Sequence, residues 1–128
     1  MIVVDTHAWV WLTDEAGRLS AAARGAIGDA STVLVSAASC LEIATLVRRG
    51  RLGLDRPAVT WIRQALMPDR IEHVAADIEI AAYAGALPDP FPGDPADRLI
   101  YATAAIRGVR LVTADRAIRE LDPARTIW

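Results

Sequence analysis

The chain contains no lysine: all 14 of its basic residues are arginine. With 16 acidic residues the formal net charge is −2, which argues against a protein that coats nucleic acid by bulk attraction. Arginine suits phosphate oxygens, although an arginine bias can equally follow from genome composition. The missing lysine also disfavours receiver-like and phosphatase-like α/β domains, which pair an acidic cluster with a lysine or use a D-x-D nucleophile.

Cysteine and long apolar runs are also scarce. The single cysteine, Cys40, cannot form an internal disulfide. No apolar run reaches the roughly 18 residues of a membrane span, and the N-terminus lacks the basic segment of a signal peptide. We therefore expect a soluble, cytoplasmic protein with no membrane partner. Aromatic residues make up 5% of the 128 residues and hydrophobic residues 53%, which predicts one domain with a largely aliphatic core.

Short β-branched runs alternate with longer Ala- and Leu-rich segments of helical period. This alternation predicts an α/β sandwich with a mainly parallel sheet. No G-x-G-x-x-G follows the first strand, so a dinucleotide-binding fold is disfavoured. The expected strands are 2–4, 32–36, 71–75, 109–113 and 125–128, and the expected helices are 8–12, 19–30, 37–50, 57–66, 77–86, 96–108 and 114–121.

Two aspartates directly follow expected strands. Asp5 ends the run "IVV", and Asp115 follows "VRLVT" in the stretch "LVTAD". Because ligands of open parallel sheets bind beyond the carboxyl ends of the strands, both residues should lie at one edge of the sheet. An aspartate between a strand and a helix is also a common N-cap, and for either residue alone the two interpretations have equal weight.

Glu42 lies within "CLEIATLV", where apolar positions wrap most of the expected helix. This pattern predicts a largely buried helix. A buried ionised carboxylate is costly unless it is paired with a cation or binds a metal. Extension of the side chain to the surface, or pairing with an arginine, is the alternative.

The stretch "GDPADRLIYATA" carries two more acids. Asp94 followed by Pro95 predicts a helix N-cap with proline at the first helical position. Asp97 then falls in the first helical turn, where negative charge suits the helix dipole. We favour the capping role for Asp94, near the site, and expect Asp97 to point toward whatever lies above the sheet.

Four acids are therefore expected at one edge of the sheet: Asp5, Glu42, Asp97 and Asp115. At about 6 Å and an effective dielectric near 20, each pair repels by roughly 3 kcal/mol, and the six pairs together approach roughly 15 kcal/mol. That total exceeds the stability of a typical domain, so protons or a divalent cation must neutralise such a cluster. An all-oxygen ligand set indicates Mg²⁺ or Mn²⁺ rather than Zn²⁺.

Four stretches in this order and spacing, "VVDTHAWVWL", "VSAASCLEIATLVRRGRL", "DPADRLIYATA" and "LVTADRAI", resemble the PIN domain family, specifically its VapC-type toxins. The resemblance covers the whole chain and implies a single PIN domain over residues 1–128. It implies a three-layer α/β/α sandwich with about five strands. It also implies a Mg²⁺- or Mn²⁺-dependent endoribonuclease, the toxin of a toxin–antitoxin pair, that forms homodimers and is inhibited by a cognate VapB-type antitoxin.

Carried over by position, the family's acidic residues are Asp5, Glu42, Asp97 and Asp115, the same four that the charge argument selects. The expected reaction is hydrolysis of RNA phosphodiester bonds by a metal-activated water. Asp5 and Asp97 are the expected core ligands, with Glu42 and Asp115 binding directly or through water. A PIN-like module that binds RNA or a partner without cleavage is the alternative.

Several residues near these acids are candidates for supporting roles. Thr6 and Thr113 are placed to hydrogen-bond a carboxylate or a water, with turn stabilisation as the alternative. Arg98 is placed to contact a substrate phosphate, although a surface salt bridge is the more common role. The cluster Arg48, Arg49 and Arg51 would suit an RNA backbone or an acidic antitoxin segment, although basic residues at a helix C-terminus are ordinary. His7 and His73 lack a metal-spaced partner, and Trp9, Trp11 and Trp61 are expected in the core or an interface.

Overall fold

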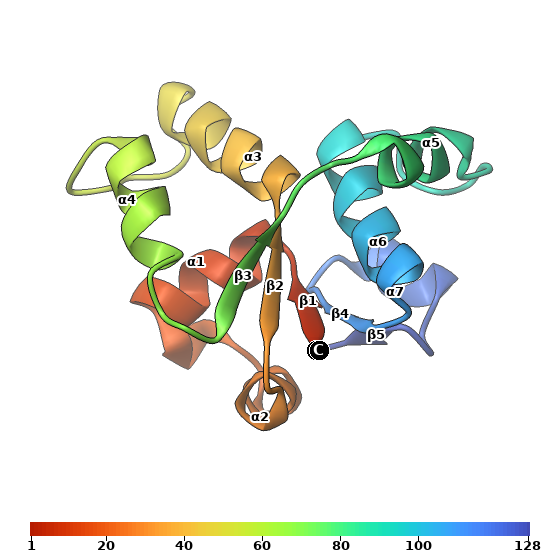
Figure 1. The fold of residues 1–128 in the computed structure, drawn as a ribbon, viewed down its shortest axis with the longest axis horizontal. Coiled ribbons are helices and arrows are strands. Elements are labelled where there is room, and N and C mark those ends of the chain that lie inside the picture. Colours follow the sequence, from red (N-terminus) through yellow and green to blue (C-terminus); the bar gives the residue numbers. More distant parts are fainter.

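The computed structural model describes residues 1–128 as an α/β fold around one five-stranded sheet (Figure 1). The strand order is β3-β2-β1-β4-β5, and every pairing is parallel. The predicted parallel sheet is confirmed, and the strands predicted at 71–75 and 125–128 lie at its edges. The strands are β1 Ile2–Val4, β2 Val33–Ser36, β3 Ile71–Val74, β4 Arg110–Val112 and β5 Thr126–Ile127.

Seven α-helices and a short 3₁₀ helix, Ala16–Arg18, connect and cover the strands. The first helix is longer than predicted because Asp5 caps it, so the helix begins directly after β1. None of the helices is long and apolar enough to cross a membrane. The helices are α1 Thr6–Asp14, α2 Ala21–Asp29, α3 Ala37–Arg48, α4 Ala58–Ala65, α5 Ile78–Ala86, α6 Pro95–Arg107 and α7 Arg116–Leu121.

The central strands β1 and β2 are buried on both faces, as expected for a parallel sheet covered by helices. Ile2 and Val4 of β1 pack in one core cluster with side chains of α1, α2 and α4. Val3, which points to the other face, packs in a second cluster with side chains of α5, α6 and α7. Figure 1 shows α1 and α4 on one side of the sheet and α5, α6 and α7 on the other. The three-layer α/β/α sandwich is therefore confirmed.

The sheet register brings three chain segments together at the carboxyl ends of the central strands. Val4 of β1 is level with Val35 of β2 on one side and with Val112 of β4 on the other. The chain leaves β1, β2 and β4 at this edge and enters α1, α3 and α7, respectively. The backbone N–H of Asp5 donates to the carbonyl of Val112 at 3.0 Å, which locks the start of α1 beside the end of β4.

Candidate active site

A pocket of about 510 Å³ lies at the carboxyl ends of the central strands. All four predicted acids line it, so the structure brings together residues that are up to 110 positions apart (from 5 to 115) in the chain. We call it the acidic pocket. Its lining consists of Asp5, Thr6, His7, Trp11, Arg18, Glu42, Asp97, Ala114 and Asp115.

Helix capping places three aspartates at this edge. The Oδ1 atoms of Asp5, Asp94 and Asp115 accept hydrogen bonds from the backbone N–H groups that open α1, α6 and α7, at 2.8, 3.1 and 3.0 Å. Each cap engages one carboxylate oxygen, so the second oxygen remains for another partner. Capping and membership of an acidic site are therefore compatible, and the positive ends of these helix dipoles offset part of the negative charge.

The tightest acidic group consists of Glu42, Asp94 and Asp97, each of which offers a carboxylate oxygen within 4.8 Å of the others. Asp94 therefore caps α6 and also belongs to this group, whereas the sequence favoured a capping role near the site, with Asp94 as a possible supporting residue. Asp97 follows in the first turn of α6 and uses its backbone N–H, not its side chain, in the cap. Its carboxylate is left to face Glu42 across the gap between α6 and α3.

The prediction that α3 is largely buried is wrong. Only Ala38, Ser39 and Ile43 of this helix are buried, and Leu41, beside Glu42, is 66% exposed. The helix packs through one stripe, while Leu41 and Ala44 are exposed and Cys40, Leu46 and Val47 are partly buried. Glu42 lies between the buried and the exposed sides of α3 and is itself half-buried, so its carboxylate can reach the acidic pocket without entering the core.

The electrostatics of the pocket disfavour the ionised acids in the absence of a cation. Burial, and then the negative charges of Asp94 and Glu42, raise the pKa of Asp97 from its ordinary value of 3.8 to about 7. Burial also raises the pKa of Asp5, although hydrogen bonds from Thr113 and from the backbone of Ala8 oppose the rise. A bound cation would reverse both effects because it favours the charged carboxylates.

Two threonines connect the elements that carry the acids. The Thr6 hydroxyl of α1 donates to the Ser39 hydroxyl of α3 at 3.1 Å, inside the protein. The Thr113 hydroxyl accepts from the backbone N–H of Asp115 at 3.0 Å and also hydrogen-bonds the carboxylate of Asp5. Thr113 therefore couples the acid after β1 to the acid after β4.

Arg98 is not among the side chains that line the acidic pocket. Its guanidinium donates instead to four backbone carbonyls, those of Ala84, Leu87, Phe91 and Pro92, at 2.9 to 3.4 Å. The side chain neither faces a substrate position nor forms a surface salt bridge. It fastens the proline-rich loop between α5 and α6, which fixes where α6 begins and hence where Asp94 and Asp97 lie.

Three pocket residues were not predicted as part of the site: His7, Trp11 and Arg18. Trp9 and Trp61 are core residues, as expected, and pack edge to face at 5.2 Å. Trp11 is half-buried and lies on the pocket side of α1, with the Arg18 guanidinium carbon 4.8 Å from its ring centroid. The spacing of His7 and Trp11, four residues apart on one helix face, was the available signal.

The acidic pocket fits a hard divalent cation. Its candidate ligands are the carboxylates of Asp5, Glu42, Asp97 and Asp115. Glu42 and Asp97 each offer a carboxylate oxygen within 4.8 Å of the other and of Asp94, which lies next to the pocket lining. Oxygen-only ligand sets suit Mg²⁺ and Mn²⁺, and this close group contains neither cysteine nor histidine to favour a softer metal.

Comparison with known proteins shows which family the chain resembles. The model of the PIN domain matches residues 2–123. Ribonuclease VapC22 of Mycobacterium tuberculosis is 43% identical to the chain, over 99% of this chain and 98% of that protein.

Solved structures share the fold at low sequence identity. The crystal structure of Mycobacterium tuberculosis VapC20, a toxin that cleaves the sarcin–ricin loop, matches with a TM-score of 0.70 and 17% identity, covering 94% of this chain and 95% of that one. VapBC2 from Rickettsia felis, bound to a promoter DNA fragment, matches with a TM-score of 0.69 and 15% identity, covering 98% and 97%. A toxin–antitoxin complex from Klebsiella pneumoniae matches with a TM-score of 0.61 and 18% identity, covering 90% and 87%.

The family match, the close relative and the fold agree with the acidic pocket described above. The prediction of a metal-dependent toxin ribonuclease is confirmed at the level of the family. The chain belongs to the PIN domain family, among its VapC-type ribonucleases.

Proposed function

We propose that the acidic pocket holds Mg²⁺ or Mn²⁺ and that the protein hydrolyses phosphodiester bonds of RNA there. Glu42, Asp94 and Asp97 are the proposed core of the metal site, and Asp5 and Asp115 complete it directly or through water. The observation that carries the proposal is the approach of three carboxylate oxygens to within 4.8 Å. Without a cation this approach is unfavourable, as the raised pKa of Asp97, about 7, indicates.

When bound, the divalent cation supplies positive charge for the phosphate and makes an attacking water more acidic. The protein's own residues prepare that position. Thr113 and the first N–H groups of α1 hold Asp5 in one orientation, and the caps of α6 and α7 do the same for Asp94 and Asp115. Their fixed geometry lowers the reorganisation needed when an anionic phosphate enters. In the overall reaction the oxygen of water bonds to phosphorus, one of the two bonds from phosphorus to a ribose oxygen breaks, and that ribose oxygen leaves with a proton.

We also propose that the protein acts in the cytoplasm as the toxin of a toxin–antitoxin pair, with a VapB-type antitoxin and a second copy of itself as partners. Two structural neighbours, the toxin–antitoxin complex from Klebsiella pneumoniae and VapBC2 from Rickettsia felis, support the antitoxin. Large apolar side chains exposed on α3 and α4, Leu41 and Val59, offer surface for a protein partner. A solution mass of twice 13.8 kDa would support the dimer.

The proposed function is tested by RNA cleavage at a fixed protein concentration with Mg²⁺, with Mn²⁺ or with a chelator. We expect cleavage products with either metal, none with the chelator, and recovery when metal is added back. Addition of the cognate antitoxin should form a stable complex and suppress cleavage. Cleavage that is equally fast in the chelator would contradict the metal site, and no cleavage of any RNA with either metal would contradict the ribonuclease.

A further inference from the structure

A second pocket, of about 420 Å³, adjoins the acidic pocket. The two pockets share four lining residues, Thr6, His7, Trp11 and Arg18, so the second continues directly from the first. Its volume lies within the range of about 300–1,000 Å³ of small-ligand sites. We call it the arginine groove, and its remaining lining consists of Val10, Glu15, Leu46, Arg51 and Leu52.

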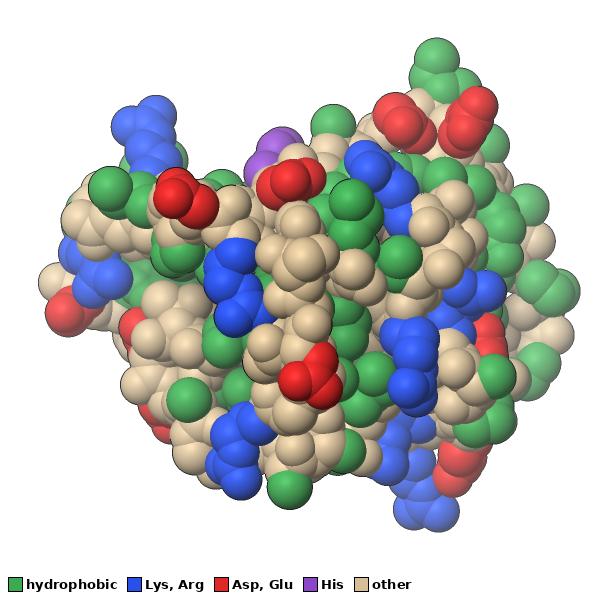
Figure 2. All heavy atoms as spheres, turned by 60° about the horizontal axis from the view of Figure 1, so that its bottom comes forward, with side chains coloured by type: hydrophobic (Ala, Val, Ile, Leu, Met, Phe, Trp, Pro, Cys, Tyr) green, Lys and Arg blue, Asp and Glu red, His purple; other side chains and the backbone are tan.

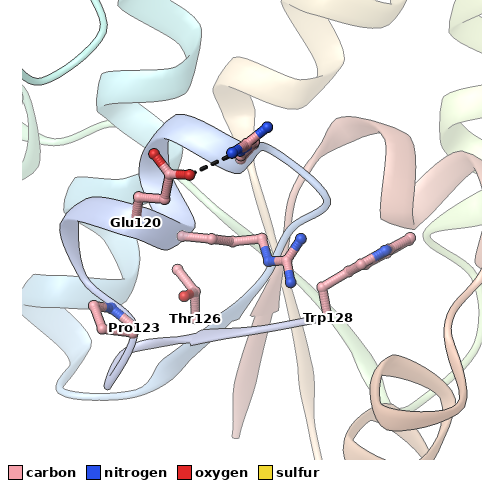
Figure 3. Close-up of a pocket in the computed structure, with 6 residues that line it drawn as sticks. Glu120, Pro123, Thr126 and Trp128 are labelled. Carbon is pink, nitrogen blue, oxygen red and sulfur yellow. Dashed lines mark hydrogen bonds and ion pairs between the residues drawn. The ribbon is translucent and has the colours of Figure 1, made fainter.

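Aromatic rings form one wall of the arginine groove. The His7 and Trp11 rings are 5.7 Å apart between centroids, and the ring of Trp128 packs on Trp11 at 5.6 Å. Figure 3 shows Trp128 extending from the end of β5 toward α1, beside a further pocket that Thr126 and Pro123 also line. Trp128 therefore packs against Trp11, whose indole lines both pockets.

Arginines supply the charge of the groove. Arg18 lies over Trp11 and at the mouth of the acidic pocket, with only a loose ion pair to Glu15 at 3.6 Å. Arg51, on the same groove, forms no ion pair. Figure 2 shows one face of the molecule, on which blue arginine side chains lie among red and green ones. Arg18 and Arg51 bring positive charge to the groove that adjoins the acidic pocket.

We infer that the arginine groove binds the nucleotide next to the scissile phosphate of a single-stranded RNA, with its base against Trp11 and His7 and its phosphate at Arg18 and Arg51. The inference rests on the proposed function, because it takes the acidic pocket as the place of cleavage. Two observations favour RNA over an acidic protein segment as the occupant: the groove is continuous with the acidic pocket, and it combines arginines with aromatic rings. Stacking on aromatic side chains together with phosphate contacts is how proteins hold single strands.

The groove also favours a single strand over a duplex. A base can lie against Trp11 and His7 only when its face is free, which stacking within a helix prevents. The groove is lined by α1, by the segment after it, and by the end of α3 with the residues that follow, and its volume of about 420 Å³ is that of a small-ligand site rather than of a groove wide enough for a duplex.

The test has two parts. The first is the binding of a single-stranded oligoribonucleotide of about ten nucleotides, measured with Asp97→Asn protein so that the RNA is not cleaved. The second is KM and kcat for cleavage, measured with protein that retains Asp97. In the Asp97→Asn background, Trp11→Leu should raise Kd about 5- to 100-fold, the loss expected for one stacked base. Arg18→Gln and Arg51→Gln, at surface positions, should each raise Kd several-fold and reduce the slope of log K against log salt by about 0.7. The matched control is Arg107→Gln, an exposed arginine at the far end of α6.

Intrinsic tryptophan fluorescence provides a second measurement, which detects a base against Trp11 without a label on the RNA. Trp9 and Trp61 are 0% exposed, so only Trp11 and Trp128 can respond to a bound base. We expect the unlabelled oligonucleotide to quench the fluorescence, and Trp11→Leu to remove most of the quenching.

The cleavage KM should rise in the Arg18 and Arg51 variants, while kcat changes little.

The outcomes separate this inference from the proposed function. If the wild type cleaves RNA but the Trp11, Arg18 and Arg51 variants match Arg107→Gln in Kd and KM, the inference is wrong and the function stands. If no metal supports cleavage but oligonucleotide binding depends on these residues, the function fails while the binding site stands. If the variants lose antitoxin binding and keep RNA binding, the groove belongs to the antitoxin and the inference is overturned.

Discussion

Asp97→Asn should cleave RNA at least about 100-fold more slowly than the wild type at the same Mg²⁺ or Mn²⁺ concentration. Asp97 offers a carboxylate oxygen within 4.8 Å of both Glu42 and Asp94, so its replacement removes one of the three acids of the closest group. Asparagine keeps the shape of the side chain and leaves the backbone cap to Asp94 intact. The measurement is the initial rate of cleavage across a metal titration.

The matched control for this variant is Asp69→Asn, which makes the same chemical change at an exposed position before β3. The control should cleave at the wild-type rate. Excess metal should recover part of the activity of Asp97→Asn if the variant binds metal weakly. A wild-type rate in Asp97→Asn at low metal would show that Asp97 is not needed to hold the cation.

The same substitution should stabilise the protein when metal is removed, and most strongly above pH 7. The folded-state pKa of Asp97, about 7, lies above its ordinary value of 3.8, so the folded protein holds a proton that the unfolded chain releases. Stability of the wild type is therefore lost as pH rises from about 4 through about 7. The raised pKa of Asp5 acts in the same direction.

Two opposing contributions determine how Asp97→Asn changes the free energy of unfolding, and the contribution from the raised pKa is the larger. A shift of this magnitude corresponds to about 4 kcal/mol for a fully buried group, and solvent screening of the half-buried Asp97 carboxylate reduces it to roughly 2 kcal/mol at pH 8, whereas loss of a negative charge near a helix N-terminus costs about 0.3–1 kcal/mol. In urea unfolding with a chelator, Asp97→Asn should therefore be more stable than the wild type at pH 8, and the difference should shrink at pH 5. Asp69→Asn should follow the wild type at both values. A less stable Asp97→Asn at pH 8 would contradict the account.

The positions of most acids could be predicted because local patterns fix them. Asp5 and Asp115 follow strands whose apolar runs are unambiguous, and parallel strands share their carboxyl edge. Asp94 followed by Pro95 marks the start of α6 with a cap, which also fixes Asp97 in the first turn. These signals act over a few residues, so tertiary packing does not change them.

Other features depended on packing between distant segments and could not be predicted. The apolar residues around Glu42 indicated a buried helix, but only one stripe of α3 meets the rest of the protein and Leu41 faces outward. Arg98 binds carbonyls of a loop whose path no local pattern fixes. The place of Trp11 beside the acids depends on Trp128, which reaches it from the other end of the chain.

Direct measurement of Mn²⁺ binding, by calorimetry or by the electron paramagnetic resonance of free Mn²⁺, bears on the metal site independently of any RNA. We predict saturable binding by the wild type, binding weakened at least about tenfold in Asp97→Asn and Glu42→Gln, and unchanged binding in Asp69→Asn. Absence of saturable binding by the wild type at millimolar Mn²⁺, or equal binding by all four proteins, would contradict a cation held by these carboxylates.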